Sequence, residues 1–350
     1  MKKIFILLPH KEKFSKDKSG SASIWVKDFI ALSDFKKEIK VYGANVSQEN
    51  AAIKNIYNNI HISELKYQSK TTIYLQKFKK FISKEQPKII EIHNRPNYLI
   101  DIHKDFPNIN YILIVHNDPL HLKGSTSIKD RINLLNICSQ IYFVSRWVEE
   151  KFFTDIEKNF YSNFKVVYPS INLLKKFPKK EKLIIFSGKL NKSKGFPTFA
   201  EAITKILDKY KDWSSVVIGD EPREKYNYRH KRLKYLGWIP YEKVLKYFSK
   251  SSITVVPSNW PEPFGRTSLE AGSRGNAVII SNRGGLPETI SSPVILKEVN
   301  SKTIYEQIVN LIQNKKLINR LQVDSFKNPL HIIPENCKII DQDRKNIINP

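Results

Sequence analysis

Two carboxylates eight residues apart, Glu262 and Glu270, have the types and spacing that suggest chemistry; they lie in the stretch Ser258–Gly275, SNWPEPFGRTSLEAGSRG. Prolines on both sides hold Glu262 in an extended loop, because a residue before proline is excluded from the helical region. Gly265 permits a tight turn, and we expect a helix from Thr267 onward, with Glu270 in its first turn. The stretch predicts a carboxylate that can bind hydroxyl groups, beside a helix N-terminus that can hold an anion.

Thr267 and Glu270 also fit a second interpretation. Their T-x-x-E spacing is that of a capping box, in which the two side chains satisfy the helix N-terminus and no ligand is needed. Both interpretations stay open on the sequence.

Two lysines form the second candidate site. Lys189 and Lys194 lie in the stretch 183–195, LIIFSGKLNKSKG, where an apolar strand runs into a polar loop. A departing diphosphate carries two or more negative charges, which two ammonium groups and a helix N-terminus could stabilise without a metal. The alternative is an ordinary pair of solvated loop lysines.

Polar residues also end two expected strands earlier in the chain. His93 and Arg95 follow one apolar run, and His116 and Asn117 follow the run Tyr111–Val115. The carboxyl ends of parallel strands meet at one edge of an open α/β sheet, where such sheets bind ligands. Each histidine could equally serve only to end its strand with a satisfied polar group.

Alternating strand and helix patterns must position these residues. The first half of the chain is expected to hold strands at 4–8, 39–41, 60–62, 87–93, 111–115 and 140–145, and helices at 24–32, 71–84 and 146–153. The second half is expected to hold strands at 183–187, 215–219, 253–257 and 277–280, and helices at 241–249 and 301–322. The pattern predicts an α/β protein with two Rossmann-like, doubly wound domains facing a central cleft.

The length of 350 residues exceeds what one core usually supports, which favours two domains. The stretch 173–182 is rich in lysine and has the composition of a linker. We therefore expect one domain at 1–173 and another at 174–326. The tail at 327–350 could be a helix that crosses back onto the first domain, although its composition does not decide this.

The order of the motifs resembles a known family. GKLNKSKG, LGWIP at 236–240, the E-x7-E stretch and GGLPE at 284–288 are similar, in this order, to the donor site of retaining glycosyltransferases of family 4, which have the GT-B fold. One departure is Lys189, where the family has an arginine with a planar fork that lysine lacks. In the first half the resemblance is sparser and includes an HNRP turn like that of some lipopolysaccharide glycosyltransferases.

The resemblance implies a role for each candidate. The groups acting on the transferred sugar and the departing diphosphate would be His116, Glu262, Lys189 and Lys194. The donor nucleotide would be bound by Gly20, Gly188, Gly237, Trp238, Phe264, Gly265, Arg266, Thr267 and Glu270. The acceptor would meet His93, Arg95 and Asn117, and no metal is expected. A plain turn at Gly20 and a core role for Trp238 are the alternatives at those two positions.

The charge and the cysteine content bear on the classes of binding partner and on the cellular compartment. The formal net charge of +25 favours anionic partners such as phosphorylated substrates or an anionic membrane surface. Because the lysines are spread along the chain, no nucleic-acid partner is expected. Two cysteines make no disulfide framework and fit a reducing, cytoplasmic compartment. The apolar run at 4–8 is too short for a signal peptide, so any membrane association is expected to be peripheral, at the inner face.

The resemblance to the family implies a metal-independent, retaining hexosyltransferase. It would move a sugar from a UDP-, GDP- or ADP-sugar to a hydroxyl of a glycan or lipid-linked acceptor, in lipopolysaccharide or cell-envelope polysaccharide synthesis. One alternative is another nucleotide-sugar-binding protein of the same fold, an epimerase or an inactive homologue. The other is a basic nucleic-acid-binding protein, which the ordered motifs disfavour. The sugar, the base, the acceptor and the oligomeric state stay open.

Overall fold

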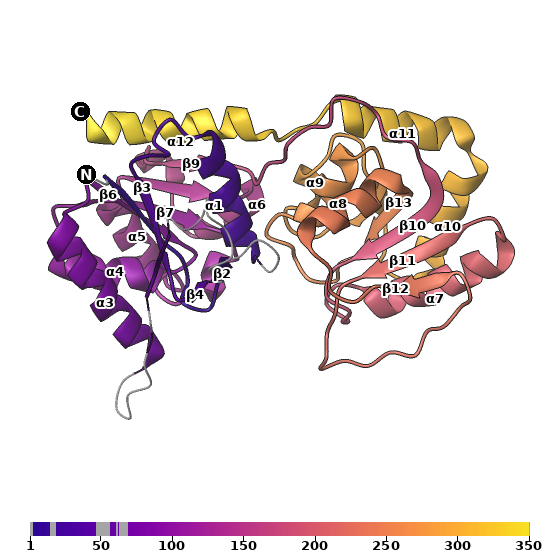
Figure 1. Ribbon diagram of the computed structural model, residues 1–350, viewed down its shortest axis with the longest axis horizontal. Helices are drawn as coiled ribbons and strands as arrows, with labels where there is room; N and C mark the ends of the chain where they lie inside the picture. The colour runs from indigo at the N-terminus through magenta and orange to yellow at the C-terminus, as the bar shows by residue number, and fades with distance from the viewer. Residues whose placement is uncertain (1–2, 15–18, 47–56, 61, 63–68, 350) are drawn as a thin grey trace. The chain divides into compact units, whose positions relative to one another are not determined.

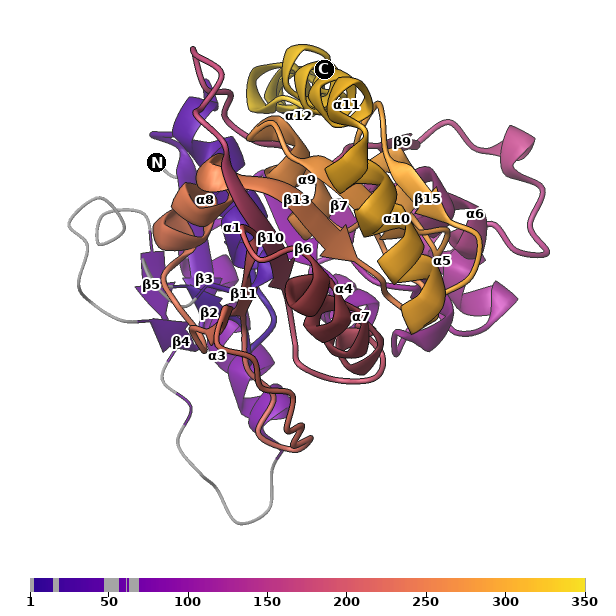
Figure 2. The ribbon, with the colours of Figure 1, turned by 90° about the vertical axis from the view of Figure 1, so that its right-hand side faces the viewer.

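Two stretches of alternating strands and helices form two units (Figures 1 and 2). Unit 1 contains Met1–Ser170 and Ile333–Pro350, and unit 2 contains Ile171–Ile332. The computed structural model describes residues 3–14, 19–46, 57–60, 62 and 69–349. The first boundary lies close to the expected linker, and the C-terminal helix is part of unit 1.

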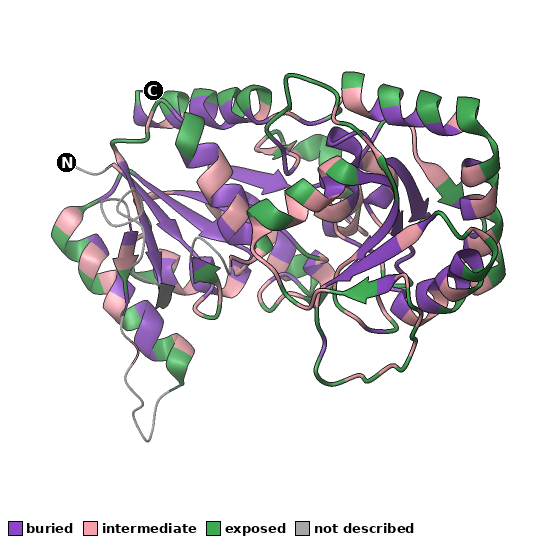
Figure 3. Cartoon of the chain, turned by 45° about the vertical axis from the view of Figure 1, so that its right-hand side comes forward, coloured by how far each residue is buried: buried purple, intermediate pink, exposed green. Residues whose placement is uncertain are grey.

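The apolar runs of unit 1 form a parallel sheet in the order β5-β3-β1-β6-β7-β8-β9. Its strands are β1 (Ile4–Leu7), β3 (Ile39–Gly43), β5 (Tyr57–Asn59), β6 (Ile89–His93), β7 (Asn110–Val115), β8 (Gln140–Phe143) and β9 (Phe164–Val166). A small second sheet pairs β2 (Lys13–Phe14) with β4 (Asn45–Val46). Central strands such as β1 and β6 are buried throughout (Figure 3), as expected for parallel strands with helices on their faces.

Helices connect these strands, and a helix from the C-terminal end of the chain packs on the same unit. The helices of unit 1 are α1 (Ser21–Leu32), α3 (Lys70–Glu85), α4 (Pro96–Asp105), α5 (Ile128–Ile137), α6 (Arg146–Phe152) and α12 (Ile333–Ile348), with short 3-10 turns at Pro119–His121 and Lys158–Phe160. Helix α12 packs against α1 and β6.

A buried ion pair fixes α12 to the sheet. The Arg344 guanidinium, 1% exposed, donates from Nε and Nη2 to the two carboxylate oxygens of Glu91 on β6, at 2.7 and 2.8 Å. Its Nη1 donates to Asp341 at 2.9 Å and to Ser33 at 3.1 Å. Two parallel hydrogen bonds in a dry environment give this contact both strength and a fixed geometry.

Unit 2 has a second parallel sheet, in the order β12-β11-β10-β13-β14-β15. Its strands are β10 (Glu181–Ser187), β11 (Ser214–Ile218), β12 (Leu233–Tyr235), β13 (Ser251–Val256), β14 (Ala277–Ser281) and β15 (Val294–Leu296). Its helices are α7 (Phe196–Lys209), α8 (Tyr241–Lys250), α9 (Arg266–Ser273), α10 (Ser301–Gln313) and α11 (Lys315–Lys327), with a 3-10 turn at Leu286–Glu288.

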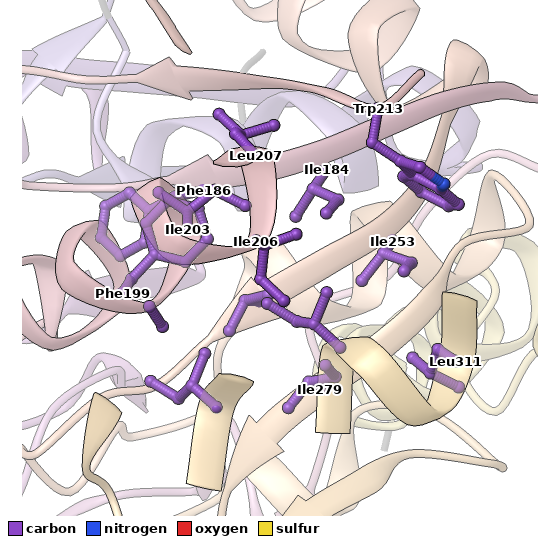
Figure 4. Close-up of a cluster of buried hydrophobic side chains, with 14 of the residues drawn as sticks. Ile184, Phe186, Phe199, Ile203, Ile206, Leu207, Trp213, Ile253, Ile279 and Leu311 are labelled. Carbon is purple, nitrogen blue, oxygen red and sulfur yellow. The ribbon is translucent and has the colours of Figure 1, made fainter. Parts of the chain in front are cut away.

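Figure 4 shows the core on one face of this sheet, where α7 meets the strands. Apolar side chains of α7 such as Ile203 and Ile206 pack on Ile184 of β10 and Ile253 of β13, and all four are buried. Their spacing of three along α7 is that of one helix face. The packing holds the ends of β10 and β13, and hence the loops that follow them, at fixed positions.

Two expected elements differ from the structure. The expected helix at 301–322 is two helices, because the Asn314 side chain accepts a hydrogen bond from the backbone N–H of Leu317 and starts α11. The expected strand at 60–62 is found at Tyr57–Asn59 instead, and His61 lies outside the described residues. Within the described part of the chain, no helix is long and apolar enough to cross a membrane.

Candidate functional site

Glu262 and Lys194, predicted separately, lie in direct contact in unit 2. The Lys194 Nζ donates to Oε1 and Oε2 of Glu262 at 2.5 and 2.7 Å. The Ser258 hydroxyl donates to the same Oε1 at 2.6 Å. Glu262 is 8% exposed, so its carboxylate is compensated and fixed in a largely dry environment.

Backbone contacts bind the two loops together. The N–H groups of Asn259 and Trp260 both donate to the carbonyl of Ser193, at 2.9 and 3.0 Å. Gly195, with φ of 71°, allows a close approach, since a Cβ there would lie 1.9 Å from the carbonyl oxygen of Pro257. The loop after β10 and the loop after β13 therefore form one rigid body around Glu262.

The GGLPE turn supports Glu262 from another direction. The backbone of Glu262 forms a parallel bridge with Gly284, and its carbonyl accepts from the N–H of Gly285 at 2.7 Å. A Cβ on Gly284 would lie 2.1 Å from that carbonyl oxygen, so only glycine fits. Glu262 is held in extended backbone, as the flanking prolines predict.

Helix α9 starts at Arg266, one residue before the expected Thr267, and it has no capping box. Gly265 is the N-cap with φ of 109°, and no side chain caps the helix. Thr267 lies inside the first turn, and Glu270 lies in the second turn, not the first. The capping-box interpretation is therefore wrong, and the carboxylate of Glu270 is used elsewhere.

Glu270 forms a buried network with two partners. The Arg266 Nε donates to Glu270 Oε1 at 3.1 Å, and the Tyr241 hydroxyl donates to the same oxygen at 3.1 Å. The Arg266 Nη2 also donates to the Tyr241 hydroxyl at 3.2 Å. Burial raises the pKa of Glu270 above its ordinary value, while Arg266 and Tyr241 act in the opposite direction.

The other predicted donor residues follow strands of the same unit. Gly188 and Lys189 follow β10, and the Lys189 side chain is exposed. Gly237 follows β12 with φ of 64° and has nothing within 4 Å of its Cβ position, and Trp238 is 49% exposed. Trp238 is therefore no core residue. Phe264 is 3% exposed and lies against His331, so it packs and does not present its ring to a ligand.

Unit 1 places the predicted histidines together. The His93 Nδ1 and the His116 Nε2 lie 2.9 Å apart, one donating and the other accepting. Burial lowers the pKa of His93 well below its usual value, and the nearby His116 and Arg344 lower it further. His93 is 0% exposed, which corrects its expected role as an acceptor contact. It lies behind His116, whose backbone N–H donates to Asn94 Oδ1 at 3.2 Å.

Gly20 is a second correction. It is the N-cap of α1, but the carboxylate of Glu12 already lies at this helix N-terminus and accepts from the N–H of Ser23 at 3.0 Å. The N–H of Gly20 donates to the carbonyl of Lys13 at 3.3 Å. The amides of Gly20 and Ser23 at this turn are therefore already engaged by other groups of unit 1. The expected acceptor residues Arg95 and Asn117 are half-buried and exposed, respectively.

Three side chains that the sequence reasoning did not select complete the site in unit 2. Ser258 contacts Glu262, Tyr241 contacts Glu270, and the Asn191 Oδ1 accepts from the backbone N–H of Lys194 at 3.0 Å. Ser258 and Asn191 lie within the two motif stretches, where a polar residue next to a predicted site was a usable signal. Tyr241 starts a different helix, and no local pattern connects it with Glu270.

Comparisons with known proteins bear on the family and the fold. Residues 174–325 match the family model of glycosyl transferases group 1. The spore coat protein SA of Bacillus subtilis is 23% identical, with 91% of this chain and 92% of that protein covered.

Solved structures show the fold. The structure of Anabaena Alr3699/HepE in complex with UDP and glucose matches with a TM-score of 0.75 and 14% identity, covering 99% of this chain and 100% of that one. WaaG, a glycosyltransferase involved in lipopolysaccharide biosynthesis, matches with a TM-score of 0.70 and 10% identity, covering 99% of this chain and 100% of that one. The predicted class, two doubly wound α/β units of the GT-B fold, is confirmed. Together with the family match, these likenesses support a GT-B glycosyltransferase.

Proposed function

We propose that this protein is a retaining glycosyltransferase that moves a sugar from a nucleoside diphosphate sugar to a hydroxyl of a glycan or lipid-linked acceptor. The observation that carries the proposal is the contact between Lys194 and Glu262, with α9 and Glu270 next in the same chain segment. A carboxylate fixed by a cation can accept hydrogen bonds from sugar hydroxyls, and Glu270 can accept them from a ribose. The family match and the UDP-bound neighbour support this donor class.

The reaction breaks the bond between the anomeric carbon and the diphosphate oxygen and forms a bond from that carbon to the acceptor oxygen. Lys189, Lys194 and the N–H groups at the start of α9 would stabilise the negative charge on the departing diphosphate, without a metal. A phosphate oxygen would take the proton of the incoming hydroxyl on the same face, which keeps the anomeric configuration. His116 and Glu262 would orient the transferred sugar.

Lysine at position 189 changes how the diphosphate would be held. Its ammonium supplies the charge but only as a point, whereas an arginine could bind two oxygens at once. Lys194 is already directed by Glu262, so it would bind the donor in a defined orientation. We therefore assign the larger share of diphosphate binding to Lys194.

The acceptor is assigned to unit 1 and the donor to unit 2. The positive charge, with the likeness to WaaG, supports an acceptor in lipopolysaccharide or other cell-envelope glycan synthesis at the cytoplasmic face of a membrane. An anionic leaflet would attract a chain with this net charge.

The test is thermal stabilisation of the purified protein by UDP-, GDP-, ADP- and CMP-sugars. One nucleoside diphosphate sugar should raise the melting temperature, and the shift should disappear in Glu270→Ala and Lys194→Ala but persist in Lys211→Ala, an exposed lysine of the same unit. If none of these nucleotide sugars shifts the melting temperature at millimolar concentration, the proposal is overturned. Release of an epimerised sugar without any acceptor would replace transfer with epimerisation.

A further inference from the structure

His10, directly after β1 and Pro9, lies among aromatic side chains from two helices of unit 1. Its Nδ1 is 2.7 Å from the hydroxyl of Tyr98 on α4. Its ring centroid is 6.2 Å from that of Tyr74 on α3, which in turn lies 6.0 Å from that of Tyr98. The Tyr74 hydroxyl donates to the carbonyl of Leu8 at 2.8 Å, so this aromatic side chain is bound to the chain just after β1. The imidazole is therefore held in place.

Cations from three segments act electrostatically on this imidazole, and together with it they form what we call the basic cluster: His10, Lys11, Lys70 and Arg95. Arg95 is near because β1 and β6 are paired in parallel, with Leu7 opposite Ile92, so the residues that follow both strands emerge side by side. Lys70 lies one turn before Tyr74 on α3. Burial lowers the pKa of His10, and the three cations lower it further.

The Arg95 guanidinium is oriented by the backbone of the residue before it. Its Nη1 donates to the carbonyl oxygen of Asn94 at 2.8 Å. Asn94 has φ of 56°, in the left-handed region that asparagine adopts more readily than most other residues. Its own N–H donates to Ile114 O at 2.7 Å, and its Oδ1 accepts from His116. These hydrogen bonds of Asn94 connect Arg95 with the start of the loop that carries His116.

We propose that the basic cluster binds a phosphate group of the acceptor. This inference rests on the proposed function, and it specifies the acceptor as an anionic one. Arginine binds phosphate through two parallel N–H groups and lysine binds it as a point charge, so the cluster has both kinds of contact. A protonated His10 would donate from Nε2 to the phosphate while Nδ1 donates to Tyr98.

Two sources could supply this phosphate: a phosphorylated sugar, or the headgroup of a lipid. Both would meet the same side chains, since the cluster recognises charge and oxygen geometry. A sugar phosphate would occupy the site in solution, whereas a lipid phosphate would bring unit 1 to an anionic surface. The experiment therefore has one arm for each source.

The signals of the His10 imidazole report binding at the cluster itself. In full-length protein labelled with 15N, a pH titration should give a His10 pKa that rises when α-D-glucose 1-phosphate is added, by roughly one unit or more, because an opposite charge favours the imidazolium. Unphosphorylated glucose should leave it unchanged. In the second arm, vesicles of phosphatidylglycerol are compared with vesicles of phosphatidylcholine.

Matched variants connect the response to the cluster. Arg95→Gln and Lys70→Gln should each weaken the response several-fold, whereas Lys84→Gln, at the exposed far end of α3, should not. A His10 pKa that neither glucose 1-phosphate nor phosphatidylglycerol shifts would overturn the proposal. The donor experiment detects binding in unit 2, so a missing donor shift with a responding His10 would reject only the proposed transfer reaction.

Discussion

The two units handle charge differently at the ends of their strands. In unit 2, both candidate carboxylates have cationic partners from the same unit, Glu262 with Lys194 and Glu270 with Arg266. In unit 1, two members of the basic cluster contact neutral groups: the His10 Nδ1 lies 2.7 Å from the Tyr98 hydroxyl, and Arg95 donates to the carbonyl of Asn94. A carboxylate fixed by a cation can accept hydrogen bonds from hydroxyl groups, whereas clustered cations attract an anion.

Unit 1 does pair a carboxylate where the fold needs it, and this gives the largest expected effect. Arg344→Ala would leave Glu91 buried without its partner, and removing one member of a buried pair typically costs about 3–5 kcal/mol. Urea unfolding followed by hydrogen exchange in β6 would measure the loss. Lys345→Ala, on the exposed side of α12, is the control and should change the free energy of unfolding little. Equal stability of the two variants would show that the pair contributes nothing.

In unit 2, Gly195 permits the close approach of the two loops around Glu262. A substitution there tests how much this close approach contributes to stability. Gly195→Ala should cost roughly 1–2 kcal/mol from its positive φ, and a further roughly 1–3 kcal/mol because its Cβ overlaps the carbonyl of Pro257. Gly237→Ala has a similar φ but open space, so it should show only the first cost. Thermal unfolding compares the two. Identical losses would mean that the close approach at Pro257 relaxes freely.

The residues selected from the sequence come together more directly in unit 2 than in unit 1, and the physical reason is locality. Lys194 and Glu262 lie on loops whose motifs are each contiguous, and parallel pairing of β10 with β13 brings the two loops together. Position along the chain was therefore enough to place both residues on adjacent loops. What it could not predict was their direct contact, which depends on side-chain geometry across the two loops.

In unit 1 the chain order was less informative. His93 was predicted to face an acceptor, but the alternation of side chains along β6 turns it into the interior against His116. His10 was missed, because its neighbours Tyr74 and Tyr98 come from helices more than sixty residues away in sequence. The strand pattern was predicted well, since apolar runs depend only on local composition, whereas contacts between side chains of distant elements leave no local pattern.

Lowering the pH should reduce the stability of unit 1 more than that of unit 2. His93 and His10 in unit 1 have lowered pKa values, so the stability they contribute is present above their ordinary pKa of 6.5 and is lost as the pH falls. His331 in unit 2 acts in the same direction, but Glu270 acts in the opposite one, because its raised pKa makes protonation favour the folded state. Each histidine contributes at most about 1.4 kcal/mol per pH unit.

Hydrogen exchange between pH 7 and pH 5 measures this difference, after correction for the intrinsic exchange rate. Protection in β6 and β7 of unit 1 should decrease more steeply than protection in β10 and β13 of unit 2. The His331→Asn variant should flatten the dependence in unit 2 and leave unit 1 unchanged. A steeper decrease in unit 2 would contradict the assignment of the acid-sensitive groups to unit 1.

The smallest expected effect concerns the position of Glu270. Tyr241→Phe removes the hydroxyl that joins Arg266 to Glu270, and a hydrogen bond of this kind contributes about 1 kcal/mol. If Glu270 binds the ribose only when it is held in place, the dissociation constant of the nucleoside diphosphate should rise by up to about tenfold, which calorimetry would measure. Tyr247→Phe, on the same helix, should leave it unchanged. Unaltered affinity in Tyr241→Phe would show that Arg266 alone fixes the carboxylate, and the contrast with the neutral partners of unit 1 would then rest on ion pairs only.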